Sequence, residues 1–150
     1  MPKLVRKWHT ILLALLPFLF KTVPAYAACH ISAASISFGN YDVFASTNLL
    51  GTGTVQTSGC PGSSGTATAD AGVNSGGSFN PRKMKLSSGS DLLNYNLYTD
   101  SARTVIWNTS SGVIDWSGNT TVTFYGSIPS GQTNAGIGTY QDIVTVTINF

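Results

Sequence analysis

The sequence closes with Tyr140-Gln-Asp-Ile-Val-Thr-Val-Thr-Ile-Asn-Phe150, a stretch in which apolar and polar side chains alternate. Side chains of a β-strand point to opposite faces of the sheet with a period of two. One face of this stretch would therefore be apolar, and the other would carry Thr and Asn. The pattern predicts a half-buried β-strand. Its inward-facing residues are expected to be Val144, Val146, Ile148 and Phe150.

No residue follows Phe150 in this sequence to cover the outer edge of that strand. An open apolar sheet edge is a pairing site, and natural proteins usually block or cover such edges. We therefore expect the edge to be covered either by an earlier strand of the same chain or by a strand from another chain. The choice between these alternatives decides the function.

The amino-terminal residues have the pattern of a secretory signal peptide. A basic start is followed by an apolar run over residues 11–20 and by a small-x-small cleavage pattern at residues 25–27. The apolar run is about half as long as the ~20 residues that span a bilayer. We predict that residues 1–27 are a cleaved signal peptide and that residues 28–150 form one exported domain. An uncleaved membrane anchor is the alternative.

Removal of the signal peptide changes the charge of the protein. Four of the eight Lys and Arg residues leave with it, whereas all six acidic residues, every one of them Asp, remain. The mature chain then carries four positive and six negative side chains, a formal net charge of −2. Such a chain lacks the basic footprint of a nucleic-acid-binding protein and the polybasic cluster of a membrane-surface binder. Its length of about 120 residues fits one domain with a buried core.

The two cysteines, Cys29 and Cys60, are predicted to form one structural disulfide, because the chain is exported. The bridge would close a loop of about 32 residues, worth roughly 3–4 kcal/mol in the chain-entropy model. A metal site or a catalytic thiol is the alternative. His30 is the one histidine left after cleavage, and a neighbouring Cys and His alone make a poor metal site. We expect no metal and no cofactor.

Short apolar or Thr-rich segments alternate with turns rich in Gly, Ser, Pro and Asn along the mature chain, and no segment shows a helical stripe. This spacing predicts an all-β sandwich without a second domain. The interval 42–51 could be a loop or a short bent strand. The expected strands cover residues 31–38, 52–60, 66–70, 82–86, 92–98, 104–107, 120–125 and 140–150.

The residue patterns in this chain that resemble catalytic motifs are weak. The mature chain has no Glu and one His, so a Ser-His-Asp triad would have to recruit His30 beside the bridge. The Asp residues show no sign of the pairing that glycosidases use. The Gly-x-Gly motifs at residues 51–53 and 136–138 lack the strand-to-helix setting of a phosphate-binding loop, and we interpret them as turn or bulge glycines. No enzymatic activity is expected.

Aromatic side chains form a further candidate site. They could make a patch that binds sugars or surfaces, but packing in the core is the favoured interpretation. The residues concerned are Trp107, Trp116, Phe124 and Tyr125.

Two arginines, Arg82 and Arg103, make up half of the mature basic residues. We expect each to form a surface ion pair with a nearby carboxylate, for which Asp91 or Asp100 is a candidate. Ion pairs of this kind contribute little to stability.

Several motifs occur in a fixed order along the chain. They include Cys29, Cys60 and the closing stretch 138–150, which is the strongest piece. The other motif residues are Phe38, Gly39, Tyr41, Arg82, Met84, Tyr95, Tyr98, Asp100, Arg103, Tyr125, Gly126, Tyr140 and Asp142. In order and spacing these motifs resemble the spore coat protein U domain family, which includes Csu-type subunits of archaic chaperone–usher pili. The resemblance covers essentially the whole mature chain.

The resemblance implies an incomplete immunoglobulin-like sandwich of the pilin type, which lacks its final strand. In such pilins a periplasmic chaperone supplies that strand during export, and the amino-terminal extension of the next subunit replaces it in the fibre. Val144, Val146, Ile148 and Phe150 would then form the final-strand wall of the groove, and basic residues of the chaperone would grip the terminal carboxylate. The implied partners are the periplasmic chaperone, an outer-membrane usher, other pilin subunits and a surface or host receptor. The implied location is the cell surface, reached through the periplasm.

One feature departs from the family pattern. Family pilins carry a donor segment before the first cysteine, whereas cleavage after Ala27 would leave only Ala28 before Cys29. We therefore expect a subunit that accepts a strand but does not donate one. This predicts a tip or terminal position in a fimbria, with a role in adhesion and biofilm formation. A misread gene start or cleavage site is the alternative.

Two other classes of function remain open from the sequence. One is a secreted spore-coat or envelope matrix protein that uses the same fold. The other is a small carbohydrate-binding module that uses the aromatic side chains.

Overall fold

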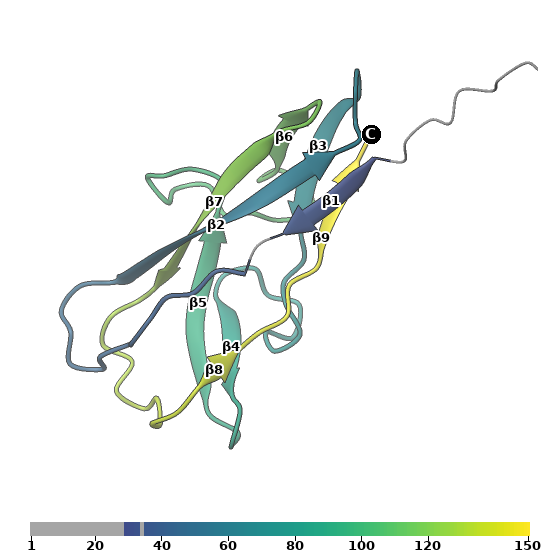
Figure 1. Cartoon of the computed structure of the whole chain (residues 1–150). Coiled ribbons are helices and arrows are strands. Elements are labelled where there is room, and N and C mark those ends of the chain that lie inside the picture. The colour runs from purple at the N-terminus through teal and green to yellow at the C-terminus, as the bar shows by residue number, and fades with distance from the viewer. Residues whose placement is uncertain (1–28, 34) are drawn as a thin grey trace, which may run out of the picture.

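The structure is a computed structural model that describes residues 29–33 and 35–150. The predicted signal peptide, residues 1–27, lies outside the described residues. The described chain contains nine β-strands, arranged in two sheets (Figure 1). In this part of the chain there is no helix of the length and apolar character that crossing a membrane requires. The prediction of an all-β sandwich is confirmed.

The larger sheet has six strands in the order β1-β2-β7-β5-β4-β8, and the smaller sheet has the order β6-β3-β9. Neighbouring strands are antiparallel throughout. The larger sheet comprises β1 (His30–Ala33), β2 (Leu49–Ser58), β7 (Thr121–Ile128), β5 (Leu92–Tyr98), β4 (Arg82–Leu86) and β8 (Tyr140–Gln141). The smaller sheet comprises β6 (Ile114–Ser117), β3 (Ser64–Ala69) and β9 (Val146–Asn149).

The expected strand boundaries hold best in the middle of the chain. Strands β4 and β5 cover the same residues that the sequence predicts. The segment 104–107 is not the strand that we expected, because it contributes only an isolated bridge between Tyr98 and Ile106. The interval 42–51 is mostly a loop, and its last residues belong to β2. Strand β6 is not predicted from the sequence.

The closing stretch 140–150 is divided between the two sheets instead of forming one strand. Strand β8 pairs with β4 in the larger sheet, and β9 pairs with β3 in the smaller one. Residues 142–145 connect them and lie outside both strands. A chain that changes sheets forms a corner of the sandwich and cannot keep one continuous ladder.

Aromatic side chains fill the core between the sheets, which confirms packing as the role of both tryptophans. Trp107 has no exposed surface, and Trp116 is 4% exposed. The indole N–H of Trp107 donates a hydrogen bond to the carbonyl of Ala67 over 2.9 Å. Its ring centroid lies 5.0 Å from that of Phe124, another core residue.

The predicted disulfide is confirmed between Cys29 and Cys60, whose Cα atoms are 4.6 Å apart. Cys29 immediately precedes β1, and Cys60 lies just beyond the end of β2. Strand β1 pairs along β2, with His30 opposite Ser58. The bridge therefore fastens a short edge strand to its neighbour.

In place of the expected surface ion pairs, both arginines bind backbone carbonyls. The guanidinium of Arg82 is fully buried and donates to the carbonyls of Asp70 (3.0 Å from Nε and 2.7 Å from Nη2) and Trp107 (2.6 Å from Nη2). Arg103 donates from Nε to the carbonyl of Gly126 over 3.1 Å. Burial lowers the pKa of Arg82, and the negative groups around it act in the opposite direction. Charge alone did not reveal that carbonyls, and not carboxylates, are the partners.

Candidate functional site

The first and last strands of the described chain are both edge strands. Strand β1 pairs only with β2, and β9 pairs only with β3, so each described strand keeps one unpaired side. The two strands belong to different sheets, and the sandwich is therefore open along one side. Figure 1 shows β1 at the start of the described chain and β9 next to the C-terminus.

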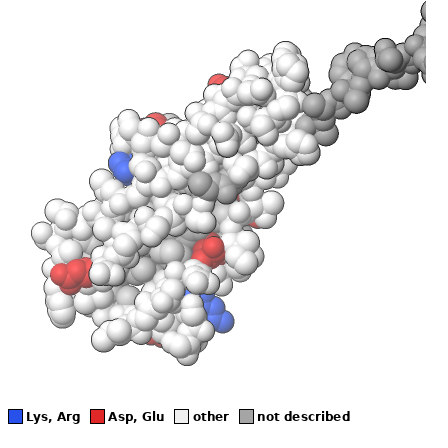
Figure 2. All heavy atoms as spheres, in the orientation of Figure 1, with Lys and Arg blue, Asp and Glu red and all other residues white. Residues whose placement is uncertain are grey.

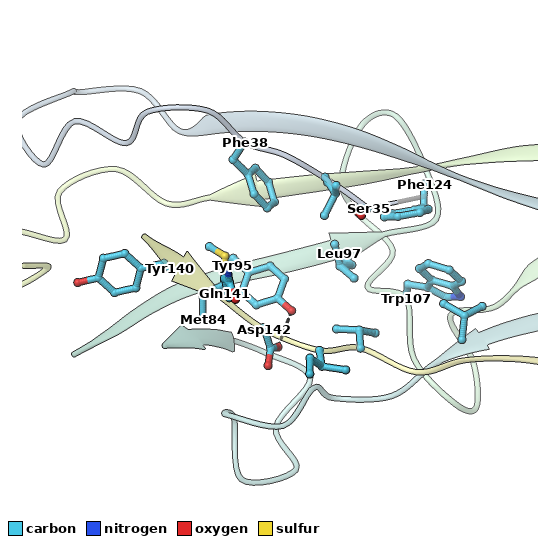
Figure 3. Close-up of a pocket in the computed structure, with 14 residues that line it drawn as sticks. Ser35, Phe38, Met84, Tyr95, Leu97, Trp107, Phe124, Tyr140, Gln141 and Asp142 are labelled. Atoms are coloured by element: carbon cyan, nitrogen blue, oxygen red, sulfur yellow. Dashed lines mark hydrogen bonds between the residues drawn. The ribbon is translucent and has the colours of Figure 1, made fainter. Parts of the chain in front are cut away.

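A cleft of about 560 Å³ lies in this open side (Figure 3). One border comes from the segment after β1, and the other comes from the segment that leads into β9. We call residues 35–44 the first wall and residues 135–146 the second wall. The floor is mostly apolar. It contains Met84, Tyr95, Leu97 and Phe124 of the larger sheet and Trp107, which lies outside the strands.

A second hollow of about 630 Å³ continues the first between the same two walls. Both hollows are lined by Ile36, Phe38, Met84 and Tyr140, so they join into one groove. Apolar side chains at the floor of the second hollow include Leu93 and Ile128. The face drawn in Figure 2 carries few and scattered charged side chains.

The first wall is positioned by packing against glycines. Gly51 of β2 and Gly126 of β7 are cross-strand partners in the larger sheet. A Cβ atom at Gly126 would lie 2.6 Å from Cζ of Phe38 and would also meet Ile36. A Cβ atom at Gly51 would lie 3.0 Å from Cδ1 of Phe38. The missing side chains of two glycines therefore make room for the two apolar side chains of this wall.

The interpretation of the motif at residues 51–53 as turn glycines is wrong, since both glycines lie inside β2. Gly51 faces Phe38, and a Cβ atom at Gly53 would overlap the ring of Phe124. Close approach of aromatic rings is the reason for glycine here. The glycines at 136–138 do lie in a loop, in the second wall.

The four residues that the sequence predicts for the final-strand wall are placed differently from one another. Val144 and Val146 line the groove, and Ile148 is half-buried against the core. Phe150 is 76% exposed, and its ring stands edge-on to Trp116 with 5.4 Å between centroids. Trp116 lies opposite Gly65 of β3, which has no side chain to separate the two rings.

Seven of the motif residues border the groove. Tyr95 and Asp142 are joined by a hydrogen bond of 2.6 Å, in which the phenol O–H donates to Oδ2 of the carboxylate (Figure 3). Burial raises the pKa of Tyr95, and the hydrogen bond to Asp142 raises it further, so the phenol stays a donor. The full set is Phe38, Gly39, Tyr41, Met84, Tyr95, Tyr140 and Asp142.

A second group of motif residues holds the loop after β5 against β7. The carboxylate of Asp100 accepts hydrogen bonds from the backbone N–H groups of Thr104 (3.0 Å) and Val105 (2.8 Å). The hydrogen bond from Val105 is the main cause of the lowered pKa of Asp100. Arg103, at φ 58°, reaches β7 from this loop. The group consists of Tyr98, Asp100, Arg103, Tyr125 and Gly126. Arg82, the remaining motif residue, is fully buried and binds the carbonyls of Asp70 and Trp107.

Sequence reasoning did not include the first wall in the site. Ile36 is absent from the predicted site residues, and Phe38 was included only through the family motif. The alternation of Ile36 and Phe38 with Ser35 and Ser37 was the available signal. Among the described residues there is no group of three or more His, Cys, Asp or Glu side chains that could hold a metal ion.

Fold and groove together define a disulfide-linked β-sandwich domain with an open side between its first and last strands. The family model of the Spore Coat Protein U domain matches residues 18–147. The chain belongs to this family, as its motifs indicate.

The known proteins that are similar to this chain include the following two. Protein U of Myxococcus xanthus is 31% identical over 140 residues, which cover 82% of this chain and 78% of that protein. The fold is similar to a chain in the crystal structure of the CsuC-CsuE chaperone-tip adhesion subunit pre-assembly complex from archaic chaperone-usher Csu pili of Acinetobacter baumannii. The TM-score is 0.53 and the identity is 22%, and the match covers 82% of this chain but only 39% of that one.

Proposed function

We propose that this protein is an exported structural subunit of a chaperone–usher fimbria and that its groove accepts a β-strand from another chain. The observation that carries the proposal is the open side of the sandwich, where the segment after edge strand β1 and the segment that leads into edge strand β9 border an apolar floor. Unpaired strand edges offer backbone hydrogen bonds, and the hollows between them can take alternate side chains. Together, the strand edges and the hollows are what β-augmentation requires, in which an extended segment of another chain adds a strand to a sheet.

The incoming segment must have a defined chemistry. It has to be extended, because its backbone pairs with a strand edge. Its inward side chains must be apolar, because they meet Leu97, Phe124 and Val144. Its outward side chains remain in solvent and can be polar.

The partners in this proposal are a periplasmic chaperone, an outer-membrane usher and other pilin subunits. The similar Csu chain comes from a complex described as chaperone–tip adhesion subunit, which supports a chaperone partner here. Residues 1–27 would direct export and be removed, and the domain 28–150 would reach the cell surface. Contact with a surface or host receptor would give the fimbria its role in adhesion and biofilm formation.

A tip or terminal position is part of the proposal. It rests on the cleavage pattern at residues 25–27, which leaves Ala28 alone before Cys29. Because Cys29 is held in the disulfide, a single residue is free to extend toward a neighbour. Sequencing the amino terminus of the exported protein tests this point. A mature terminus that begins many residues before Cys29 would contradict it.

Strand acceptance can be tested by filling the groove within one chain. A tight turn and an alternating Val/Thr strand are added after Phe150, so that the new strand can fold back along β9. We expect the extended chain to be monomeric and to unfold at a higher temperature than the mature chain alone. The control carries Asp in place of each inward Val, and its unfolding temperature should equal that of the mature chain alone. Equal unfolding temperatures for all three proteins, each a monomer, would contradict the proposal.

A spore-coat or envelope matrix protein is the second candidate. The family description and the similarity to Protein U favour it. Electron microscopy with an antibody against the protein distinguishes the two candidates, because a fimbrial subunit labels fibres and a matrix protein labels a continuous layer. The carbohydrate-binding alternative loses its support, since the side chains of Trp107 and Trp116 are buried.

A further inference from the structure

The second wall contains a segment that no strand supports. Residues 142–145 lie between β8 and β9, outside every described strand, and border the open groove. Segments with few backbone hydrogen bonds and an exposed side are usually the first parts of a domain to open. The contacts that hold this segment therefore decide whether the second wall is ordered when a ligand reaches the groove.

Asp142 fastens the beginning of the segment to two other parts of the molecule. Its Oδ2 accepts the hydrogen bond from Tyr95 in the groove floor, at 2.6 Å (Figure 3). Its Oδ1 accepts hydrogen bonds from the backbone N–H of Val73 (3.1 Å) and from Nδ2 of Asn74 (2.8 Å). One carboxylate thus links the wall to the floor and to the loop behind the wall.

Asp70 fastens the end of the segment. Its backbone N–H donates to the carbonyl of Thr145 (3.0 Å), and its Oδ1 accepts from the N–H of Thr145 (2.9 Å). The same Oδ1 accepts from the N–H of Gly72 (2.9 Å). The buried guanidinium of Arg82 holds the carbonyl of Asp70 in turn. These contacts replace the ladder that a neighbouring strand would provide.

The loop behind the wall is shaped to receive the carboxylate of Asp142. Gly72 has a φ of 79°, in the left-handed region that favours glycine. A Cβ atom at this position would lie 2.8 Å from Cγ of Asp142 and even closer to Oδ2. Any other residue at position 72 would therefore push the carboxylate from its place.

From these contacts we infer that Tyr95 and Asp142 are positioning residues for strand uptake, which hold the second wall in its accepting geometry while the groove is unfilled. The inference rests on the proposed function. We call the hydrogen bonds of Asp142 to Tyr95, Val73 and Asn74 the clamp. Once a strand is bound, its own backbone hydrogen bonds support the wall, and the clamp contributes less to the position of the wall. An ordered wall removes an ordering cost from binding. Loss of the clamp should therefore slow association more than it speeds dissociation.

The test compares the mature, oxidised wild type with Tyr95→Phe and Asp142→Asn. Tyr95→Phe keeps the ring in the floor and removes only the hydroxyl. The probe is a fluorescent peptide with alternating Val and Thr that spans both hollows, and stopped-flow anisotropy gives its association and dissociation rates. The matched control is Asp100→Asn, which removes a carboxylate that also binds backbone N–H groups but lies in the loop after β5.

We expect association to slow about tenfold in Tyr95→Phe, which loses a hydrogen bond to a charged group. Dissociation should change little. Asp100→Asn should lower the unfolding temperature and leave both rates as in the wild type. Equal association rates in wild type and Tyr95→Phe, or an effect confined to dissociation, would overturn the inference.

A second measurement needs no ligand. Hydrogen exchange on the unfilled chain should be faster in Tyr95→Phe at the amides of Thr145, which donates to Asp70, and Val73, which donates to Asp142, with unchanged protection in β2 and β7. Unchanged protection of these two amides overturns the inference even if the wild type binds the peptide well. The other outcome is that the wild type binds no alternating peptide although hydrogen exchange differs between wild type and Tyr95→Phe as expected. That outcome contradicts strand acceptance and leaves the positioning role of Tyr95 in place.

Discussion

The ring of Phe38 occupies the space that a side chain at Gly126 would need, because a Cβ atom there would lie 2.6 Å from Cζ of the ring. Gly126 is in the centre of the larger sheet, where β7 pairs with β2. Phe38 lies outside the strands, in the first wall of the groove. The position of that wall therefore depends on a residue that has no side chain.

Gly126→Ala is expected to displace the first wall and to lower the free energy of unfolding by about 1–3 kcal/mol, as extra methyl groups do in filled sites. Thr123→Ala is the control, since Thr123 is exposed on the same strand. It should change stability by no more than about 0.5 kcal/mol. Urea denaturation of the oxidised proteins measures both effects. If Gly126→Ala has the same urea midpoint as the wild type, the position of the Phe38 ring does not depend on the glycine.

Arg82→Ala is expected to be among the most destabilising substitutions. It leaves the carbonyls of Asp70 and Trp107 without their donor, and each unpaired buried group costs about 1–3 kcal/mol. Arg103→Ala should cost less, because Arg103 is only half-buried. Denaturation midpoints rank the two variants, and the reverse order would contradict this account of the buried arginine.

Acid should weaken the fold through Asp70. Burial by itself raises the pKa of this carboxyl, but hydrogen bonds from Gly72 and Thr145, together with the charge of Arg82, lower it overall. The ionised form thus stabilises the fold above the pKa of the unfolded chain, about 3.9, and this contribution is lost as the pH falls through the lower folded pKa. The unfolding temperature of the wild type should drop below about pH 4, and Asp70→Asn should show a flatter profile. If the unfolding temperatures of the wild type and Asp70→Asn fall in parallel as the pH is lowered, Asp70 is not the source of the acid sensitivity.

Removal of the disulfide should cost roughly 3–4 kcal/mol for a loop of this length. The double variant Cys29→Ser and Cys60→Ser measures this cost by urea denaturation. Hydrogen exchange should show that β1 loses protection first, because the bridge fastens this edge strand to β2. Dithiothreitol should destabilise the wild type and leave the double variant unaffected. A wild type that keeps its stability after reduction would contradict the expectation.

The sequence was sufficient to predict the class of fold, because period-two alternation reports the faces of a strand. It predicted β4 and β5 to the residue. It did not predict that residues 140–150 divide between two sheets, since alternation says nothing about which sheet a strand joins. The contacts responsible, such as Thr145 with Asp70, connect residues far apart in the chain.

The candidate site was only partly predictable for a similar reason. Val144 and Val146 were found from alternation, and Asp142 and Tyr95 from family motifs alone. A buried arginine is rare, so Arg82 was assigned to the surface. Its partners are backbone carbonyls, and no residue type in the sequence marks them. Phe150 was expected to be buried in the groove wall, but its side chain is 76% exposed and its ring packs against the buried Trp116, next to Gly65.

The walls of the groove run in opposite directions. Residues 36–38 share one hollow with residues 142–146, whereas residues 39–44 share the next with residues 135–140. Any strand that settles between them is parallel to one wall and antiparallel to the other, whichever end enters first. Parallel pairing gives slanted, evenly spaced hydrogen bonds, and antiparallel pairing gives perpendicular ones. The chain direction of an inserted strand therefore decides which of the two borders faces it in the antiparallel arrangement.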